Sequence, residues 1–315
     1  MIRFEGVSKH FAGAPGPAVD RLDLTIPEGS TCVLIGPSGC GKSTTLRLVN
    51  RLIEPDAGRI TLGGRDVAHT DPIGLRRGIG YVLQGVGLFP HRSVGQNVAT
   101  VPGLLGWPKA RIARRVDAML DFVGLDPATY RDRRPDALSG GQRQRVGVAR
   151  ALTADPPVIL MDEPFGAVDP VARGRLQAEI GAILKHLSKT VLIVTHDIDE
   201  AMLMGDRVVL MKAGRVVQAE APRALLAAPA DAFVASFVGE DRALRRLALM
   251  TVADVAEPGE AAGVPAIAGG ASLRDALSTM LASGGTRLAV TGDAGPRLVT
   301  LDAIRRAGAV GKREG

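Results

Sequence analysis

Short apolar runs alternate with amphipathic stretches over the first 240 residues. Continuous β-branched and apolar runs are typical of strands buried on both faces. Such runs occur at 31–35, 158–161 and 191–194. Helical spacing of apolar residues is found at 42–52 and 171–187, and strand-like patterns at 2–7 and 19–27. This alternation predicts an α/β fold with a largely parallel sheet that has helices on both faces.

A helical insertion is predicted before the apolar run at 158–161. Between 109 and 123 apolar residues recur at helical spacing on one face, namely Ile112, Val116, Met119, Leu120 and Val123. We therefore expect a helical subdomain at about 91–150, inserted between the first group of strands and the next buried strand.

The composition of the chain changes near residue 240, where a charged stretch precedes a segment rich in Ala, Gly and Pro. That segment has a pattern of helix, strand, turn, strand and helix, at 272–283, 288–290, 292–295, 298–300 and from 301 onwards. We expect a first domain over 1–240, a linker over 241–250, a small α/β domain over 251–308 and a flexible tail over 309–315.

Composition and charge narrow the class of protein. No apolar run approaches the roughly 18 residues that a membrane span needs, and the chain starts on a strand pattern rather than a signal segment, so we expect any membrane role to come through a partner. The net charge is +6, but the basic residues are scattered and one Trp and two Tyr offer no stacking platform, which argues against nucleic acid. Cys32 and Cys40 match neither a disulfide framework nor a metal spacing, as expected in a reducing cytoplasm.

A glycine-rich loop between a predicted strand and a predicted helix is the first candidate site. The sequence fits G-x-x-x-x-G-K-[ST], in the strand–loop–helix context that a phosphate-binding loop requires. Glycines allow backbone N–H groups to turn towards phosphate oxygens, and we expect Lys42 to neutralise the β- and γ-phosphates and Ser43 to bind Mg²⁺. The loop consists of Gly36, Pro37, Ser38, Gly39, Cys40, Gly41, Lys42, Ser43 and Thr44.

Polar side chains follow three other predicted strands. Because the carboxyl ends of parallel strands face a common ligand crevice, we expect Asp162 to hold Mg²⁺ and Glu163 to take a proton from the attacking water. His196 follows the run at 191–194 and is placed to contact the γ-phosphate. Gln84 follows a shorter strand pattern, and its amide is suited to contact both Mg²⁺ and water.

A second phosphate-binding helix start is predicted at Ser139, Gly140, Gly141 and Gln142. Helix N-termini expose unpaired N–H groups and bind anions. One nucleotide needs only one such start from its own chain, so the second suggests that two copies meet with ATP between them. Phe11, 25 residues before the phosphate loop, either stacks on adenine or belongs to the core.

In their order along the chain, these residues resemble the ATP-binding-cassette ATPases over residues 1 to about 240. Phe11 resembles the adenine-stacking aromatic of that family, 36–44 its Walker A loop and Gln84 its Q-loop glutamine. Ser139–Gln142 is similar to its signature, Asp162 with Glu163 to its Walker B motif and catalytic glutamate, and Asp169 with His196 to its D-loop and switch histidine. The resemblance implies a P-loop NTPase fold, ATP and Mg²⁺ as cofactors, and a homodimer in which the signature of each protomer closes on the ATP held by the other.

Five shorter stretches are similar to importers of quaternary-amine osmoprotectants such as glycine betaine, carnitine and choline. They lie at 51–55, 75–84, 87–91, 101–107 and 237–242. The pattern over 250–307 resembles a single cystathionine-β-synthase-type (CBS) motif, which those importers often carry in tandem; here Ala303 replaces an acidic residue that is usual in the motif. Val168 replaces the usual Leu of the D-loop, and Gly85 a Gln that is common in this subfamily.

The resemblance implies an ATP-hydrolysing subunit at the cytoplasmic face of the inner (plasma) membrane, peripheral to it. Its partners would be integral-membrane permease subunits, docked near 84–98, and indirectly an extracellular or periplasmic substrate-binding protein. Three alternatives stay open: an importer of an amino acid or another small solute, an exporter subunit, and a soluble cassette ATPase without a transport role.

Overall fold

A six-stranded sheet forms the centre of the first part of the chain in the computed structural model, which describes residues 1–166, 168–259, 263–292 and 295–309. The strand order is β10-β9-β3-β8-β7-β6, and β9, β3, β8, β7 and β6 run parallel. The expected strands at 31–35, 158–161 and 191–194 are confirmed as β3, β7 and β8, which are buried along their whole length. The six strands are β3 (Thr31–Ile35), β6 (Ile79–Val82), β7 (Val158–Asp162), β8 (Thr190–Val194), β9 (Arg207–Lys212) and β10 (Arg215–Glu220).

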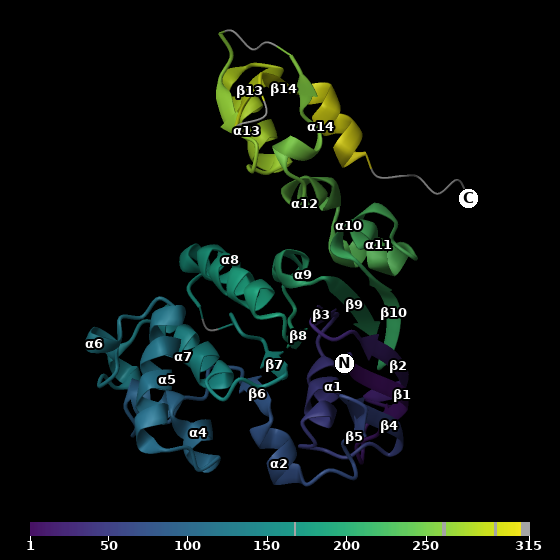
Figure 1. The fold of residues 1–315 in the computed structure, drawn as a ribbon. Coiled ribbons are helices and arrows are strands. Elements are labelled where there is room, and N and C mark those ends of the chain that lie inside the picture. The colour runs from purple at the N-terminus through teal and green to yellow at the C-terminus, as the bar shows by residue number, and fades with distance from the viewer. Residues whose placement is uncertain (167, 260–262, 293–294, 310–315) are drawn as a thin grey trace. The chain divides into compact units, whose positions relative to one another are not determined.

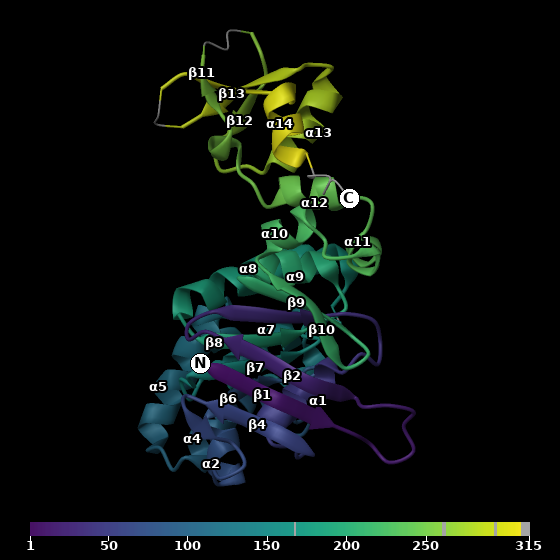
Figure 2. The ribbon, with the colours of Figure 1, turned by 90° about the vertical axis from the view of Figure 1, so that its right-hand side faces the viewer.

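A second, antiparallel sheet has the order β2-β1-β4-β5, and its strands β1, β2 and β4 lie side by side in Figure 2. The patterns at 2–7 and 19–27 predicted strands, but not that they pair with each other outside the parallel sheet. Ile2 and Phe4 of this sheet belong to the same hydrophobic core as Leu34 and Leu160 of the central sheet. The strands are β1 (Ile2–Lys9), β2 (Val19–Ile26), β4 (Ala57–Leu62) and β5 (Arg65–Asp66).

Helices pack against the central sheet as the alternating pattern predicts. Helix α1 contacts β7, β8 and also β4, while α7 packs on β6 and α9 on β3 (Figure 1). The helices α3 to α7 lie between β6 and β7 in the chain, and the expected subdomain over about 91–150 stays a prediction. The helices are α1 (Lys42–Val49), α2 (Pro72–Arg77), α3 (Val94–Val98), α4 (Thr100–Leu104), α5 (Lys109–Phe122), α6 (Pro127–Tyr130), η1 (Pro135–Ala137), α7 (Gly140–Leu152), α8 (Pro170–Leu187) and α9 (Ile198–Met204).

The chain divides into two compact units, Met1–Ala219 and Glu220–Gly315. The domain boundary expected near 240 therefore lies inside the second unit and stays a prediction. The stretch 241–250, expected as a linker, contains helix α12 (Arg242–Ala248), whose Leu247 belongs to the core of this unit. Also in this unit are α10 (Pro222–Ala227) and α11 (Ala232–Val238).

The second unit has its own four-stranded sheet of order β11-β14-β13-β12. The helix, strand, strand and helix expected between 272 and 308 are confirmed, whereas β11 and β12 were missed because they are only two and three residues long. The elements are η2 (Val252–Asp254), β11 (Glu257–Pro258), β12 (Ala266–Ala268), α13 (Leu273–Ser283), β13 (Arg287–Thr291), β14 (Arg297–Thr300) and α14 (Leu301–Gly308). Residues 293–294 of the expected turn and 310–315 of the expected tail lie outside the described residues.

None of the helices in the described part of the chain is both long and apolar enough to cross a membrane. Cys32 and Cys40 are both buried and free.

Candidate functional site

The phosphate-binding loop connects the carboxyl end of β3 to the start of α1, and its glycines are required by its geometry. Gly36 and Gly41 have φ angles of 146° and 104°, which disfavour residues with a side chain. A Cβ on Gly36 would lie 2.2 Å from the backbone oxygen of Met211, and one on Gly41 would lie 2.2 Å from that of Ala18. The loop is therefore packed against backbone on two sides, which fixes its path.

Substitutions at two glycines of the loop, Gly39 and Gly41, can separate the cost of backbone strain from the cost of steric crowding. Gly39 has a φ of 78° but open space around its Cβ position, whereas Gly41 combines a positive φ with the close contact to Ala18. We expect Gly39→Ala to lower the free energy of unfolding by about 1–2 kcal/mol through the backbone alone. Gly41→Ala should cost about 1–3 kcal/mol more, because the added methyl group overpacks the site. Urea denaturation of both variants measures this difference, and equal losses would contradict the crowding at Gly41.

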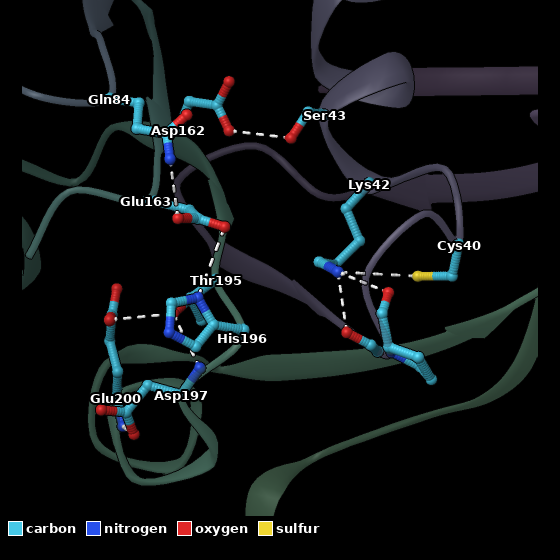
Figure 3. A network of polar contacts seen from close by, with 12 residues as sticks. Cys40, Lys42, Ser43, Gln84, Asp162, Glu163, Thr195, His196, Asp197 and Glu200 are labelled. Carbon is cyan, nitrogen blue, oxygen red and sulfur yellow. Dashed lines mark hydrogen bonds and ion pairs between the residues drawn. The ribbon is translucent and has the colours of Figure 1, made fainter. Parts of the chain in front are cut away.

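Lys42 is held inside the loop. Its ammonium donates hydrogen bonds to the backbone oxygens of Gly36, at 2.7 Å, and Pro37, at 3.1 Å, and lies 3.7 Å from the sulfur of Cys40 (Figure 3). The residue is only 7% exposed. Its contacts are two backbone oxygens and a sulfur rather than a carboxylate, so the ammonium is available to an anion and the geometry suits phosphate binding.

Asp162 and Ser43 face each other across the site. The Ser43 hydroxyl donates to Oδ1 of Asp162 at 3.1 Å, at the carboxyl end of β7. Burial raises the pKa of Asp162 above its ordinary value, and a bound cation favours the ionised form. A hydroxyl, a carboxylate and the nearby amide of Gln84 are hard oxygen donors of the kind that Mg²⁺ binds together with substrate phosphates. No group of three or more His, Cys, Asp or Glu side chains that could hold a metal occurs in the described parts of the chain.

Glu163 contacts the other two expected catalytic residues, Gln84 and His196. Its carboxylate accepts a hydrogen bond from Nε2 of Gln84 at 3.0 Å and lies 3.4 Å from Nδ1 of His196. These residues follow the ends of β7, β6 and β8, and Figure 3 shows their side chains pointing toward one another. The backbone of Glu163 has a φ of 45°, and its N–H donates to the oxygen of Val194 at 2.8 Å. A non-glycine residue in this strained conformation, held by a neighbouring strand, is typical of a functional position.

A pocket of about 270 Å³ joins the phosphate loop to Glu163 and His196. It is lined by Ser38, Gly39, Cys40, Gly41, Lys42, Ser43, Thr44, Glu163 and His196. A cationic loop and a carboxylate thus face the same cavity. The arrangement can hold phosphate groups and, at the opposite wall, accept a proton from water.

The remaining expected site residues lie elsewhere. Ser139 caps α7 by accepting from the N–H of Gln142 at 3.3 Å, and the Gln142 side chain accepts from the N–H of Ser139 at 3.0 Å. Asp169 caps α8 by accepting from the N–H of Val171 at 2.9 Å. None of these three residues lines the phosphate pocket. Phe11 is 45% exposed, which excludes the core alternative, and the Lys9 ammonium lies 5.8 Å from its ring centroid.

Sequence reasoning missed the residues that surround His196. Thr195, Asp197 and Glu200 are hydrogen-bonded to one another around it. One signal was available, because an Asp followed three residues later by a Glu before an apolar stretch indicates a helix N-terminus. Asp197 does cap α9, but the Glu200 side chain points to Thr195 rather than completing a capping box.

The parallel sheet and the phosphate loop at the end of β3 define a P-loop nucleotide-binding protein. A family model described as "ABC transporter" matches residues 19–166. The osmoprotectant import ATP-binding protein OsmV of Salmonella typhimurium is 50% identical over 82% of this chain and 68% of its own length. The glycine betaine uptake system ATP-binding protein YehX of Escherichia coli is 50% identical over 90% of this chain and 92% of its own length. The chain belongs to the ABC transporter family, among its ATP-binding proteins.

Other comparisons agree with this assignment. The glycine betaine/carnitine/choline transport ATP-binding protein OpuCA of Bacillus subtilis is 49% identical over 78% of this chain and 64% of its own length. Among solved structures, the dimeric post-hydrolysis state of the ATP-binding cassette MJ0796 bound to ADP and Pi has a TM-score of 0.63 at 31% identity, covering 70% of this chain and 99% of that one. The protein is accordingly an ATPase with the P-loop α/β fold.

Proposed function

We propose that this chain hydrolyses ATP to drive the import of quaternary-amine osmoprotectants such as glycine betaine, carnitine and choline. The observation that carries the ATPase part is the position of Glu163, which faces the phosphate loop between Gln84 and His196. The cargo is supported by the relatives OsmV, YehX and OpuCA, whose names specify osmoprotectants, glycine betaine, carnitine or choline.

In this proposal each polar group of the pocket has a separate task. Lys42 would neutralise the phosphates of ATP. Ser43, Asp162 and Gln84 would hold Mg²⁺, which would supply positive charge near the transferred phosphoryl group. Glu163 accepts the proton of the attacking water, and Gln84 and His196 hold its carboxylate in place from two sides. His196, whose side chain is 64% exposed, would contact the γ-phosphate.

Two copies of the chain would form the complete site. Ser139–Gln142 presents a capped helix N-terminus that does not line the phosphate pocket of its own protomer. Such a helix start binds anions, so its ligand is expected to be the ATP held by a second copy. The dimeric structures of the cassette MJ0796 support dimerisation.

The permease would dock beside Gln84. A cavity of about 550 Å³ is lined by Leu52, Ile53, Tyr81, Leu83 and Gln84, among others, and both Leu52 and Leu83 are exposed. Because Gln84 also donates to Glu163, a membrane subunit seated here would contact the catalytic carboxylate through one side chain. In this proposal the protein lies at the cytoplasmic face of the membrane, and a substrate-binding protein acts on the other side.

For the second unit we retain the CBS-like interpretation as part of the proposal. It is supported by the succession of β12, α13, β13, β14 and α14 around one core, with β12 and β13 parallel and β13 and β14 antiparallel. A role in regulation and a role in dimerisation are both compatible with this arrangement.

Transport by the complete importer tests the proposal. Cells that express the chain with its permease and binding protein are expected to accumulate radiolabelled glycine betaine, choline or carnitine, and the same cells with Glu163→Gln are expected to accumulate none. Uptake of only amino acids or other solutes would favour the first alternative, and efflux would favour an exporter. Full ATPase activity without any transport would overturn the transport role.

A further inference from the structure

Three hydrogen bonds form a closed ring around His196. The Thr195 hydroxyl donates to Oε2 of Glu200 at 2.9 Å, and the N–H of Asp197 donates to the Thr195 hydroxyl at 3.0 Å. The N–H of Glu200 in turn donates to Oδ1 of Asp197 at 3.1 Å (Figure 3). The ring joins the end of β8 to the first turn of α9. It therefore fixes the backbone on both sides of His196, while the imidazole itself is largely exposed.

Glu200 is the buried member of the ring. It is 3% exposed, and its second oxygen, Oε1, has no hydrogen-bond partner among the residues that the structure describes. Burial raises the pKa of its carboxyl from 4.5 to about 8, helped by the negative charges of Asp197 and Glu163 and opposed by Thr195 and the positive charge of Arg173. At neutral pH the carboxyl is therefore mainly protonated, and it can accept from Thr195 without placing a charge in the core.

Arg173 extends this arrangement to the start of α8. Its Nη1 lies 3.9 Å from Oδ2 of Asp197, and its Nη2 donates to the backbone oxygen of Val168 at 3.2 Å. Val168 precedes Asp169, the expected D-loop residue. The loop that carries His196 and the chain that leads into α8 are thus connected through one guanidinium group.

We propose that Glu200 is a positioning residue for His196, acting through Thr195 and Asp197. The ring holds the His196 backbone so that Nδ1 stays within 3.4 Å of Glu163. Without this anchor the exposed imidazole samples other orientations, and a displacement of about 1 Å at a reacting group can cost 10²-fold in rate. The inference rests on the proposed role of Glu163 and His196 in ATP hydrolysis and adds to it a buried group that touches no substrate.

Variants of Thr195 test the ring. Thr195→Val keeps the shape of the side chain but cannot donate, so we expect kcat for ATP hydrolysis to fall by about 10- to 100-fold with a smaller change in KM. Thr195→Ser retains the hydroxyl and is expected to restore most of the activity. Thr153→Val is the matched control, because Thr153 is also a fully buried threonine but donates only within α7. An unchanged kcat in Thr195→Val would overturn the proposal.

The pH dependence of a Glu200 variant separates positioning from a merely structural role. An ionised Glu200 favours opening of the ring to water, so the wild-type kcat is expected to fall as the pH rises through about 8. Glu200→Gln still accepts from Thr195 and cannot ionise; its kcat at pH 7 should stay within about twofold of the wild type, and the alkaline fall should disappear. The same alkaline fall in Glu200→Gln would overturn the proposal.

Thermal unfolding of the same variant provides an independent readout. The folded protein binds the Glu200 proton more tightly than the unfolded chain, so the wild type loses stability as the pH rises from about 4.5 to about 8. Glu200→Gln is expected to have the higher Tm, by a margin that grows over this range.

If the wild type itself lacks ATPase activity, the proposed function fails. If the wild type is active but the Thr195 and Glu200 variants behave as the wild type, only the positioning role fails.

Discussion

Glu163→Gln is expected to lower kcat for ATP hydrolysis by about 10²- to 10⁴-fold, the usual contribution of a general base. A glutamine keeps the size of the side chain but cannot accept a proton from water. The glutamine keeps one oxygen that can accept from Gln84, and Lys42 and Ser43 are untouched, so ATP binding should be retained. Because ATP persists in this variant, the two copies should also stay associated. Phosphate release and size-exclusion chromatography with Mg·ATP measure the two effects.

A matched control for this variant is Glu54→Gln. Glu54 is an exposed carboxylate that pairs with Arg51 and lies outside the phosphate pocket. The Glu54→Gln variant is expected to have the same kcat and the same affinity for ATP as the wild type. Glu163→Gln with wild-type hydrolysis would show that another group acts as the base.

Mixing two variants that are each inactive is expected to restore part of the ATP hydrolysis. Lys42→Ala removes the phosphate-binding ammonium, and Ser139→Asp places a negative charge at the helix start that is proposed to bind the partner's ATP. Each variant alone has two defective sites. In a mixed dimer one site carries both defects and the other is intact, so random mixing should give about a quarter of the wild-type rate if the two sites act independently. The ATPase rate of mixed and unmixed preparations measures this.

The control for complementation is a mixture of Lys42→Ala and Glu163→Gln. Both residues line the same phosphate pocket of one protomer, so every site in a mixed dimer lacks one of them. We expect no recovery from this pair. Recovery in both mixtures, or in neither, would argue against a site that is shared between the signature of one protomer and the phosphate loop of the other.

Local chemistry explains why much of the central fold was predictable. The fully buried strands β3, β7 and β8 have continuous apolar sequences, because both of their faces pack against other parts of the protein. Such runs predict buried strands directly. The short strands β5 and β11 were missed, since two residues carry no periodicity. The separate antiparallel sheet was also missed, because alternation of apolar residues predicts a strand but not its partner.

The sequence by itself determined the phosphate loop, because glycines at Gly36 and Gly41 and the lysine at Lys42 are required by local backbone geometry and charge. It also singled out Glu163, His196 and Gln84 as polar residues at strand ends. Only the tertiary structure decided that Gln84 and His196 both contact the Glu163 carboxylate, and that Thr195 donates to a buried Glu200. The physical reason is that such contacts join groups on different strands and helices, whose distances depend on the packing of the sheet rather than on spacing along the chain.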